Sequence, residues 1–332
     1  MRKALRFLYF FIRFPALSFT ALLPLVGAGS VTPHVSLSRA LALLAVAVMF
    51  HIFAYVLNDV VDLPLDRTDV WRADYPLVRQ AVHPGWALLI ALVQVPLALL
   101  TTFAMGWGFA AHAALAAALA LMAVYNLWGK RCALPLVTDA VQAVAWCALM
   151  LYGALSSGTP GPVTGLLALH VFIYVMMING VHGSLRDLAN DWRGRARTTA
   201  IFLGARPGEQ GGVLLPRPFV AYAWSLQAAL VGVTLARLLR SASTGSEGVG
   251  PVAVASSLGL TLVSVLVPAI AIRMSADGPN LGLAGTLHLV ASLGVLVSLY
   301  GLSMNGAAVA TVLVVYSVPI LAMWAHNGST WG

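Results

Sequence analysis

Long apolar runs recur along the whole chain, and their length constrains the fold more than any other feature. Each approaches the roughly 20 residues that a helix needs to cross a bilayer. Lipid offers no partners for backbone N–H and C=O groups, and the runs are too long for barrel strands, so they predict helices. About ten can be distinguished, at about 14–31, 38–57, 85–105, 107–126, 134–155, 163–183, 218–238, 252–272, 281–301 and 304–324.

The sequence therefore predicts an all-α, polytopic membrane helix bundle of about nine or ten transmembrane helices around a central cavity. The composition agrees, because 60% of the residues are hydrophobic and 9% are charged, and the mean hydropathy is +0.88. These values exclude an ordinary soluble domain. No segment resembles a linker, so residues 1–332 are expected to form a single domain. Residues 1–30 imitate a secretory signal, but Arg13 interrupts their apolar run, and we expect a first transmembrane helix there.

Basic residues are distributed unevenly between the two sides of this predicted bundle. They accumulate on the cytoplasmic side of membrane proteins. With the N-terminus inside, only Arg39, Arg237 and Arg240 fall on the other side. The formal net charge of +8 is largely this asymmetry, so it requires no nucleic-acid partner and instead fits attraction to membrane lipid. The richness in Ala, Leu and Gly, with more Arg than Lys, favours a bacterial source and thus a bacterial cell membrane.

Two acidic clusters end apolar stretches on the predicted cytoplasmic side. Residues 58–66 read N-D-V-V-D-L-P-L-D, and residues 187–191 read D-L-A-N-D. Carboxylates at a membrane border carry a large desolvation cost unless water, cations or basic groups stabilise them. On a helix, the aspartates of the first cluster stand at i, i+3 and i+7 and those of the second at i and i+4, so each set shares one face.

This arrangement favours a divalent cation site that opens to the cytoplasm. Mg²⁺ takes one or two protein carboxylates and completes its coordination with water and phosphate oxygens. Two carboxylate faces therefore imply a metal-bridged diphosphate, with Mg²⁺ as the cofactor. Pro64 lies inside the first cluster and disfavours helix at Leu63. We expect a break there that moves Asp66 relative to Asp59 and Asp62.

On these motifs the chain resembles the UbiA superfamily of intramembrane prenyltransferases, which includes UbiA-type terpene cyclases. The family pattern N-D-x-x-D-x-x-x-D matches residues 58–66, and D-x-x-x-D falls on residues 187–191. The sequence R-T-T-A-I-F-L-G at 197–204 is similar to the Thr-rich stretch of the family, and the resemblance covers about residues 10–210. It implies a UbiA-like membrane domain in which the metal is held by Asn58, Asp59, Asp62, Asp66, Asp187 and Asp191.

Three features depart from the family pattern. The Arg-Pro-Leu that follows the first motif reads Tyr-Pro-Leu at 75–77, so Arg72 and Arg79 become the nearest basic candidates. The Y-x-x-x-K motif is one residue longer, from Tyr125 to Lys130. Four apolar runs follow the second cluster, which implies one helix beyond the nine that are common in the family. The resemblance still implies that the five aspartates and Lys130 are catalytic, and that the diphosphate contacts Asn58, Arg72, Lys130, Arg131 and Arg197.

The chemistry that follows is ionisation of an isoprenyl diphosphate. Mg²⁺ and basic side chains neutralise the charge that develops on the leaving group, so that the allylic C–O bond breaks and leaves a carbocation. Aromatic rings inside the bundle can shield this cation, although each also suits simple packing. Polar residues just before the second cluster can line the same space. The expected prenyl or acceptor pocket comprises Tyr55, Tyr125, Trp146, Tyr174, Asn179 and His182.

The sequence leaves open what attacks the cation. Transfer to a small aromatic or quinone-type acceptor is the prediction. A terpene cyclase, in which the double bonds of the substrate attack and no acceptor is needed, is the first alternative. A transporter or proton relay is the second, since such proteins also place carboxylates within a bundle. Their acids usually lie near the midplane, whereas these lie at the border, which favours an enzyme.

Overall fold

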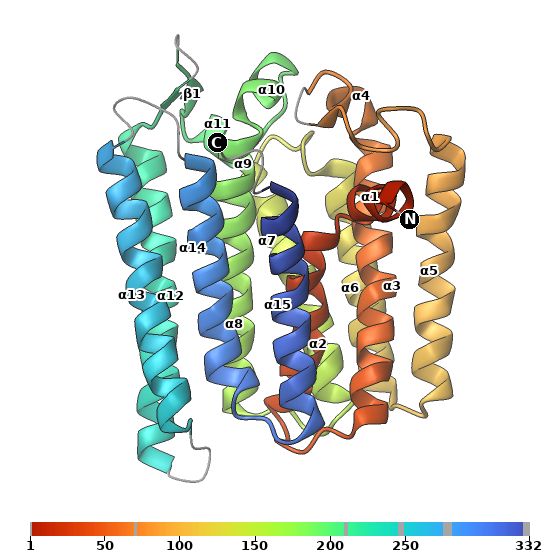
Figure 1. Ribbon diagram of the computed structural model, residues 1–332, viewed down its shortest axis with the longest axis vertical. Helices are drawn as coiled ribbons and strands as arrows, with labels where there is room; N and C mark the ends of the chain where they lie inside the picture. The colour runs from red at the N-terminus through yellow and green to blue at the C-terminus, as the bar shows by residue number, and fades with distance from the viewer. Residues whose placement is uncertain (1, 70–71, 209–211, 245–248, 275–280, 328–332) are drawn as a thin grey trace.

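The computed structural model describes residues 2–69, 72–208, 212–244, 249–274 and 281–327, and it is a bundle of long helices (Figure 1). Within these ranges, nine helices are long and apolar enough to cross a membrane, and Phe14–Gly29 forms a shorter apolar helix. The ten predicted runs are thus confirmed as helices. The nine comprise α3 (Leu37–Val61), α5 (Pro84–Ala104), α6 (Phe109–Trp128), α7 (Pro135–Leu155), α8 (Pro162–Met177), α12 (Arg217–Thr244), α13 (Pro251–Met274), α14 (Leu281–Leu296) and α15 (Ala307–Asn327).

Local sequence signals explain where several of these helices begin. Pro84, Pro135 and Pro162 each stand in the first turn of their helix, at the start of α5, α7 and α8. Proline suits this position because its φ is already helical and its missing N–H would have no helical partner. Ser36 caps α3 by accepting a hydrogen bond from the backbone N–H of Arg39 at 3.3 Å. The sequence therefore sets these helix starts locally.

The first apolar segment lies in the interior of the bundle. It consists of a short 3₁₀ turn, η1 (Phe14–Ala16), followed by α2 (Leu17–Gly29), and the residues of α2 from Ser18 to Ala28 are all buried. α2 packs against α3, α7 and α15. A helix that is buried on every side must be apolar all round, as this one is.

Glycines permit the close packing of α2 on α7. A Cβ atom at Gly27 would collide with the backbone carbonyl of Met150, and one at Gly153 would collide with the backbone carbonyl of Pro24. Small residues let helix backbones approach in this way within membranes. The crossing of α2 and α7 is therefore fixed by two glycines on opposite sides of one contact.

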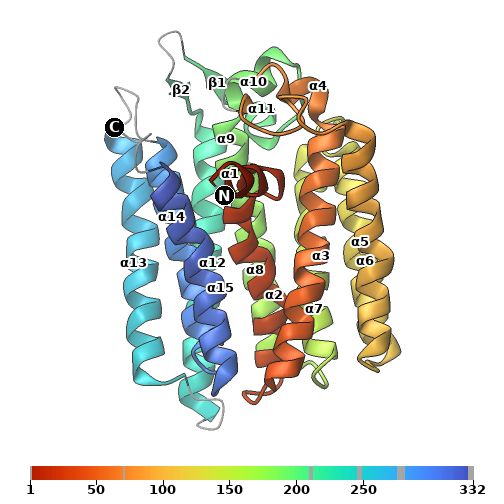
Figure 2. The same cartoon turned by 45° about the vertical axis from the view of Figure 1, so that its right-hand side comes forward.

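Short elements cover one end of the bundle, where α4 and α10 lie next to each other (Figures 1 and 2). A π-helical segment, η3 (Ile178–Gly183), continues α8 into this region. A two-stranded antiparallel hairpin pairs Arg206 with Leu214. The other elements are α1 (Arg2–Phe11), α4 (Leu63–Asp66), α9 (Ser184–Arg186), α10 (Leu188–Arg193), α11 (Thr199–Phe202), β1 (Arg206–Pro207), β2 (Val213–Leu214) and a second π-helical segment, η5 (Val297–Gly301), which continues α14.

Candidate active site

The first acidic cluster spans the junction between α3 and α4. Asn58 and Asp59 lie in the last turn of α3, and Asp62 is the residue between the helices. Pro64 stands in the first turn of α4, so the expected break is present, at Asp62. The helical spacing nevertheless continues across it, because the backbone N–H of Asp66 donates to the carbonyl of Asp62 at 2.9 Å. A proline tolerated at a helix start thus leaves Asp66 close to its helical position.

The second acidic cluster also lies at a helix junction. Asp187 stands between α9 and α10, with φ −93° and ψ 4°. The backbone N–H of Asp191 donates to the carbonyl of Asp187 at 2.9 Å, so the expected i, i+4 relation is kept. Both clusters therefore present their carboxylates from the ends of transmembrane helices.

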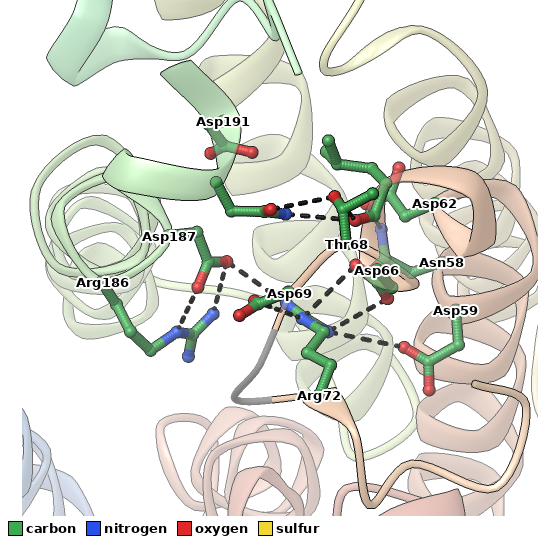
Figure 3. Close-up of polar contacts among 12 residues, drawn as sticks. Asn58, Asp59, Asp62, Asp66, Thr68, Asp69, Arg72, Arg186, Asp187 and Asp191 are labelled. Atoms are coloured by element: carbon green, nitrogen blue, oxygen red, sulfur yellow. Dashed lines mark hydrogen bonds and ion pairs between the residues drawn. The ribbon is translucent and has the colours of Figure 1, made fainter. Parts of the chain in front are cut away.

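Polar contacts between α4 and α10 hold the two clusters together (Figure 3). Oγ1 of Thr68 donates to Oδ1 of Asn190 at 3.0 Å, and Nδ2 of Asn190 donates to the carbonyl of Leu65 at 3.2 Å. Gly194 fits against Leu65, whose side chain would collide with a Cβ atom there. These contacts join segments more than a hundred residues apart and make the clusters two walls of one site.

Arg72 bridges the two walls with a single guanidinium (Figure 3). Its Nη2 lies 3.2 Å from Oδ2 of Asp187, its Nε lies 3.4 Å from Oδ1 of Asp66, and its Nη1 lies 3.9 Å from Oδ1 of Asp59. Its side chain is buried. The expectation that Arg72 belongs to the site agrees with this placement, and the arginine here contacts carboxylates on both walls.

Lys130 forms a second bridge at the junction between α6 and α7. Its Nζ lies 3.4 Å from Oδ2 of Asp62 and 3.3 Å from Oδ1 of Asp191. The longer spacing from Tyr125 thus still delivers the lysine to both clusters. Arg131 and Arg197 have exposed side chains at the edge of the site. The backbone N–H of Arg197 donates to the carbonyl of Lys130 at 3.1 Å, so Arg197 adjoins the site through its main chain.

The electrostatics of the aspartates differ between positions. Burial raises the pKa of Asp66 to about 6, although Arg72 opposes the shift. Burial likewise raises the pKa of Asp191 to about 6 against the effect of Lys130. Burial acts in the same direction on Asp187, but Arg186 and the other cations outweigh it and lower its pKa below the usual range. The carboxylates therefore depend on nearby positive charge to ionise.

Arg13 is a site residue that sequence reasoning missed. It lies between α1 and η1 with a left-handed φ of 48°. Its Nη2 donates to Oδ1 of Asn58 at 3.3 Å and contacts Oδ1 of Asp59. Its guanidinium also lies over the rings of Tyr55 and Tyr75, at 5.5 and 5.6 Å from their centroids. The available signal was a charge within an apolar run, which is itself a functional hypothesis in a membrane protein.

Three of the predicted pocket aromatics form one cluster below the first wall. Tyr55, one helical turn before Asp59, has its ring centroid 6.4 Å from that of Trp146. Phe19 lies 5.2 Å from both Trp146 and Tyr174. Trp146 and Tyr174 are buried. The sequence thus selected aromatic residues that the fold gathers from α2, α3, α7 and α8.

The other three predicted pocket residues come from α6 and η3. Tyr125 is half-buried on α6. Asn179 lies in η3, where its carbonyl accepts a hydrogen bond from Oγ of Ser184 at 2.8 Å. Nε2 of His182 lies 2.7 Å from Nδ1 of His288 on α14. His182 thereby joins a polar network toward the C-terminal helices.

The donor set fits Mg²⁺ that is shared with a phosphate ligand. Among the residues that the structure describes, no three carboxylate, imidazole or thiol groups converge as a ready-made ligand set. Mg²⁺ does not require one, because it commonly takes one or two carboxylates and fills its remaining positions with water and phosphate oxygens. Each wall offers such carboxylates, and both walls contact Arg72 and Lys130, whose cationic groups a phosphate can attract.

Comparison with known proteins was made on sequence and on fold. The model of the UbiA prenyltransferase family matches residues 16–277, which include both acidic clusters. The match ends before α14 and α15. Comparison with curated proteins gave no match.

Solved structures with a similar fold include two UbiA homologues and a synthase. An apo UbiA homologue from Aeropyrum pernix K1 is 19% identical, with a TM-score of 0.64, over 84% of this chain and 94% of that one. A UbiA homologue from Archaeoglobus fulgidus bound to DMAPP and Mg²⁺ is 18% identical, with a TM-score of 0.61, over 88% and 99%. A digeranylgeranylglyceryl phosphate synthase structure is 13% identical, with a TM-score of 0.63, over 90% and 98%. At these identities the likeness shows the fold.

Proposed function

This chain belongs to the UbiA prenyltransferase family, and we propose that it is an Mg²⁺-dependent intramembrane enzyme that ionises an isoprenyl diphosphate and transfers the prenyl group to an aromatic or quinone-type acceptor. One observation carries the proposal: Arg72 and Lys130 each contact carboxylates of both acidic clusters. Both clusters therefore lie within reach of a single small anion and its metal ions.

The two walls supply the groups that would hold the metal and the diphosphate. Mg²⁺, when bound, would neutralise negative charge on the leaving diphosphate. The homologues from Archaeoglobus fulgidus bound to DMAPP and Mg²⁺, and to GPP and Mg²⁺, support this assignment. Arg72 and Lys130 would exchange carboxylate contacts for phosphate contacts, which are charge-assisted in the same way. The proposed metal-binding residues are Asn58, Asp59, Asp62 and Asp66 on one wall and Asp187 and Asp191 on the other.

The reaction then depends on charge stabilisation and on exclusion of water. The allylic C–O bond of the donor breaks, and its electron pair leaves with the diphosphate. Arg72 and Lys130 stabilise the charge that develops on that leaving group. The rings of Tyr55, Trp146 and Tyr174 face the resulting carbocation and keep water away from it. The acceptor forms the new C–C bond and releases a proton.

Product analysis with the purified protein tests this function. The full chain is incubated with prenyl diphosphates of graded length and Mg²⁺, with and without candidate phenols, and diphosphate release and products are measured. We expect release that requires Mg²⁺, stops on chelation, and yields a prenylated phenol. Hydrocarbon formed without an acceptor would identify a cyclase instead. Transport without diphosphate release would identify a transporter, and neither activity with any donor would reject the proposal.

The proposal includes a site that opens to the cytoplasm of the cell, as the distribution of basic residues predicts. Cys132 offers a natural reporter, since it lies two residues from Lys130 and is half-buried, whereas Cys147 is buried. An impermeant thiol reagent should label Cys132 in inside-out vesicles and spare it in right-side-out vesicles. The opposite labelling pattern would show that the site faces the other side of the membrane.

A further inference from the structure

The N-terminal helix α1 lies at the end of the bundle that carries the site (Figures 1 and 2). The transmembrane helices run along the long axis of the molecule, whereas α1 crosses it. If the ends of the transmembrane helices are taken as the border of the membrane, α1 is placed near the lipid headgroups.

One side of α1 is apolar and open. Phe11 is buried against the bundle, and Phe7 stacks on it with centroids 5.4 Å apart. Phe7 and Leu8 remain 36% and 50% exposed. The same ten-residue helix carries three basic residues by sequence, Arg2, Lys3 and Arg6, and has no acidic residue. A basic, amphipathic helix at headgroup depth is suited to lie in the membrane surface.

The other side of α1 contacts the segment that supplies Arg72. Nη2 of Arg6 donates to Oδ2 of Asp74 at 2.8 Å. The ring of Phe10 lies 5.6 Å from that of Tyr75. Tyr75 in turn lies under the guanidinium of Arg72, at 5.3 Å from its centroid. The helix therefore adjoins both cations of the site: it contacts Asp74, two residues after Arg72, and it ends at Phe11, two residues before Arg13.

We propose that α1 binds anionic lipid headgroups of the surrounding bilayer, with Phe7 and Leu8 at the acyl boundary, and that this seating holds Arg13 and the Arg72 segment in place. Water is a poor solvent for the exposed apolar side chains, and the acyl boundary is the apolar phase within reach. By sequence, Arg2, Lys3 and Arg6 give the helix a positive charge that complements anionic lipid, and Arg6 also pairs with Asp74. The occupant of this surface is thus the membrane itself.

Depth measurement tests the placement without reference to catalysis. The full chain, with Cys132→Ser and Cys147→Ala, carries a nitroxide at Leu8→Cys and is reconstituted in phosphatidylcholine vesicles with or without phosphatidylglycerol. Leu214→Cys is the matched control, because Leu214 is also an exposed leucine, at 62%, on the hairpin at the same end. We expect the Leu8 label to be accessible to membrane-dissolved oxygen and the Leu214 label to an aqueous nickel chelate. Equal aqueous access at both positions would overturn the proposal.

Charge variants test the lipid chemistry. Arg6→Gln should lower the ratio of seated to unseated α1 about five-fold in phosphatidylglycerol vesicles, as expected for about 1 kcal/mol per basic residue, and much less in phosphatidylcholine. Arg79→Gln is the control, because Arg79 also contacts Asp74, at 3.7 Å, and is similarly exposed, but lies outside α1. Equal effects of the two variants, or no dependence on anionic lipid, would remove the headgroup role.

Activity connects the surface to the site, and this step rests on the proposed function. Leu8→Ser should reduce diphosphate release in phosphatidylglycerol vesicles several-fold, whereas Leu214→Ser should not. Seating of the Leu8 label in a protein that ionises no prenyl diphosphate would refute the proposed function and leave the lipid site standing. Normal turnover with an aqueous Leu8 label would refute the lipid site alone. Seating with unchanged turnover in Leu8→Ser would refute the coupling.

Discussion

Nη2 of Arg72 lies 3.2 Å from Oδ2 of Asp187, a residue 115 positions later in the sequence. The same guanidinium also contacts Asp66 and Asp59 on the facing wall. Two carboxylate walls would repel each other without a shared counter-charge. Arg72 and Lys130 supply that charge, so each has a structural role, and in the proposed function a metal–diphosphate ligand would take it over.

This double role predicts the behaviour of Arg72→Gln. Loss of the cation leaves buried carboxylates without their partner, which costs about 3–5 kcal/mol when a buried pair is broken. We expect a lower Tm in detergent, partly restored by Mg²⁺, because a ligand that binds the folded state stabilises it. Thermal unfolding with and without Mg²⁺ measures this. The exposed Arg79→Gln should change neither value, and a Tm for Arg72→Gln equal to wild type would show that the bridge is not needed.

Substitution of the acidic residues tests the metal assignment. Asp62→Ala and Asp187→Ala should each lower kcat for diphosphate release at least about a hundredfold, or about 2.7 kcal/mol, if each removes stabilisation of the transition state. Asn58→Ala should be milder, because a neutral amide contributes less to holding a dication. Steady-state kinetics on protein shown to be folded by circular dichroism provides the comparison. Near-normal turnover in either aspartate variant contradicts the proposed site.

Lys130→Ala should weaken binding of the donor. A charge-assisted contact to phosphate is worth about 1.5–3 kcal/mol, which corresponds to a roughly tenfold or larger change in Kd, whereas a screened surface pair contributes about 0–1 kcal/mol. Titration of a non-ionisable thio-diphosphate analogue measures the change. Arg131→Ala serves for comparison: the resemblance also assigns Arg131 to the diphosphate, but its side chain is exposed, so we expect a smaller change in Kd. An unchanged Kd for Lys130→Ala would leave the lysine with a topological role.

Trp146→Ala tests whether the isoprenoid tail passes the aromatic cluster. Removal of a buried tryptophan costs about 3–5 kcal/mol and opens space, so we expect reduced stability together with a preference for longer donors. Trp107→Ala is the matched control, since Trp107 is also buried and packs edge-on against Tyr152 with centroids 5.5 Å apart, away from the cluster. A shared loss of stability without any shift in donor length in Trp146→Ala would place the tail elsewhere.

The membrane fold could be predicted from the sequence because it depends on local properties, such as the length of each apolar run. Run length alone placed α7 at 134–155, and the helix is Pro135–Leu155. The break in the first acidic cluster was also predicted, because Pro64 acts on its own neighbours. What periodicity did not provide was the π-helical segment Ile178–Gly183, which continues the end of α8 and carries Asn179 and His182.

The residues of the site could be predicted from the sequence only in part. Asp59, Asp62 and Asp66 share spacing signals within one segment, and basic residues nearby pointed to Arg72 and Lys130. The pairing of Arg13 with Asp59 spans 46 positions and depends on how α2 packs inside the bundle. No local pattern encodes such a contact, so a charge in the first apolar run was interpreted as topology. The same reason kept His182 from being linked to His288, 106 positions later.

The glycine crossing of α2 and α7 has a consequence at the opposite end of the helix. Arg13 precedes Gly27 by fourteen residues, which corresponds to about 20 Å along a helix. Gly27 and Gly153 leave no room for a side chain at the crossing, so an alanine at either position would have to push α2 and α7 apart. We expect this displacement to extend along α2 to its N-terminal end and to shift the guanidinium of Arg13 away from Asp59.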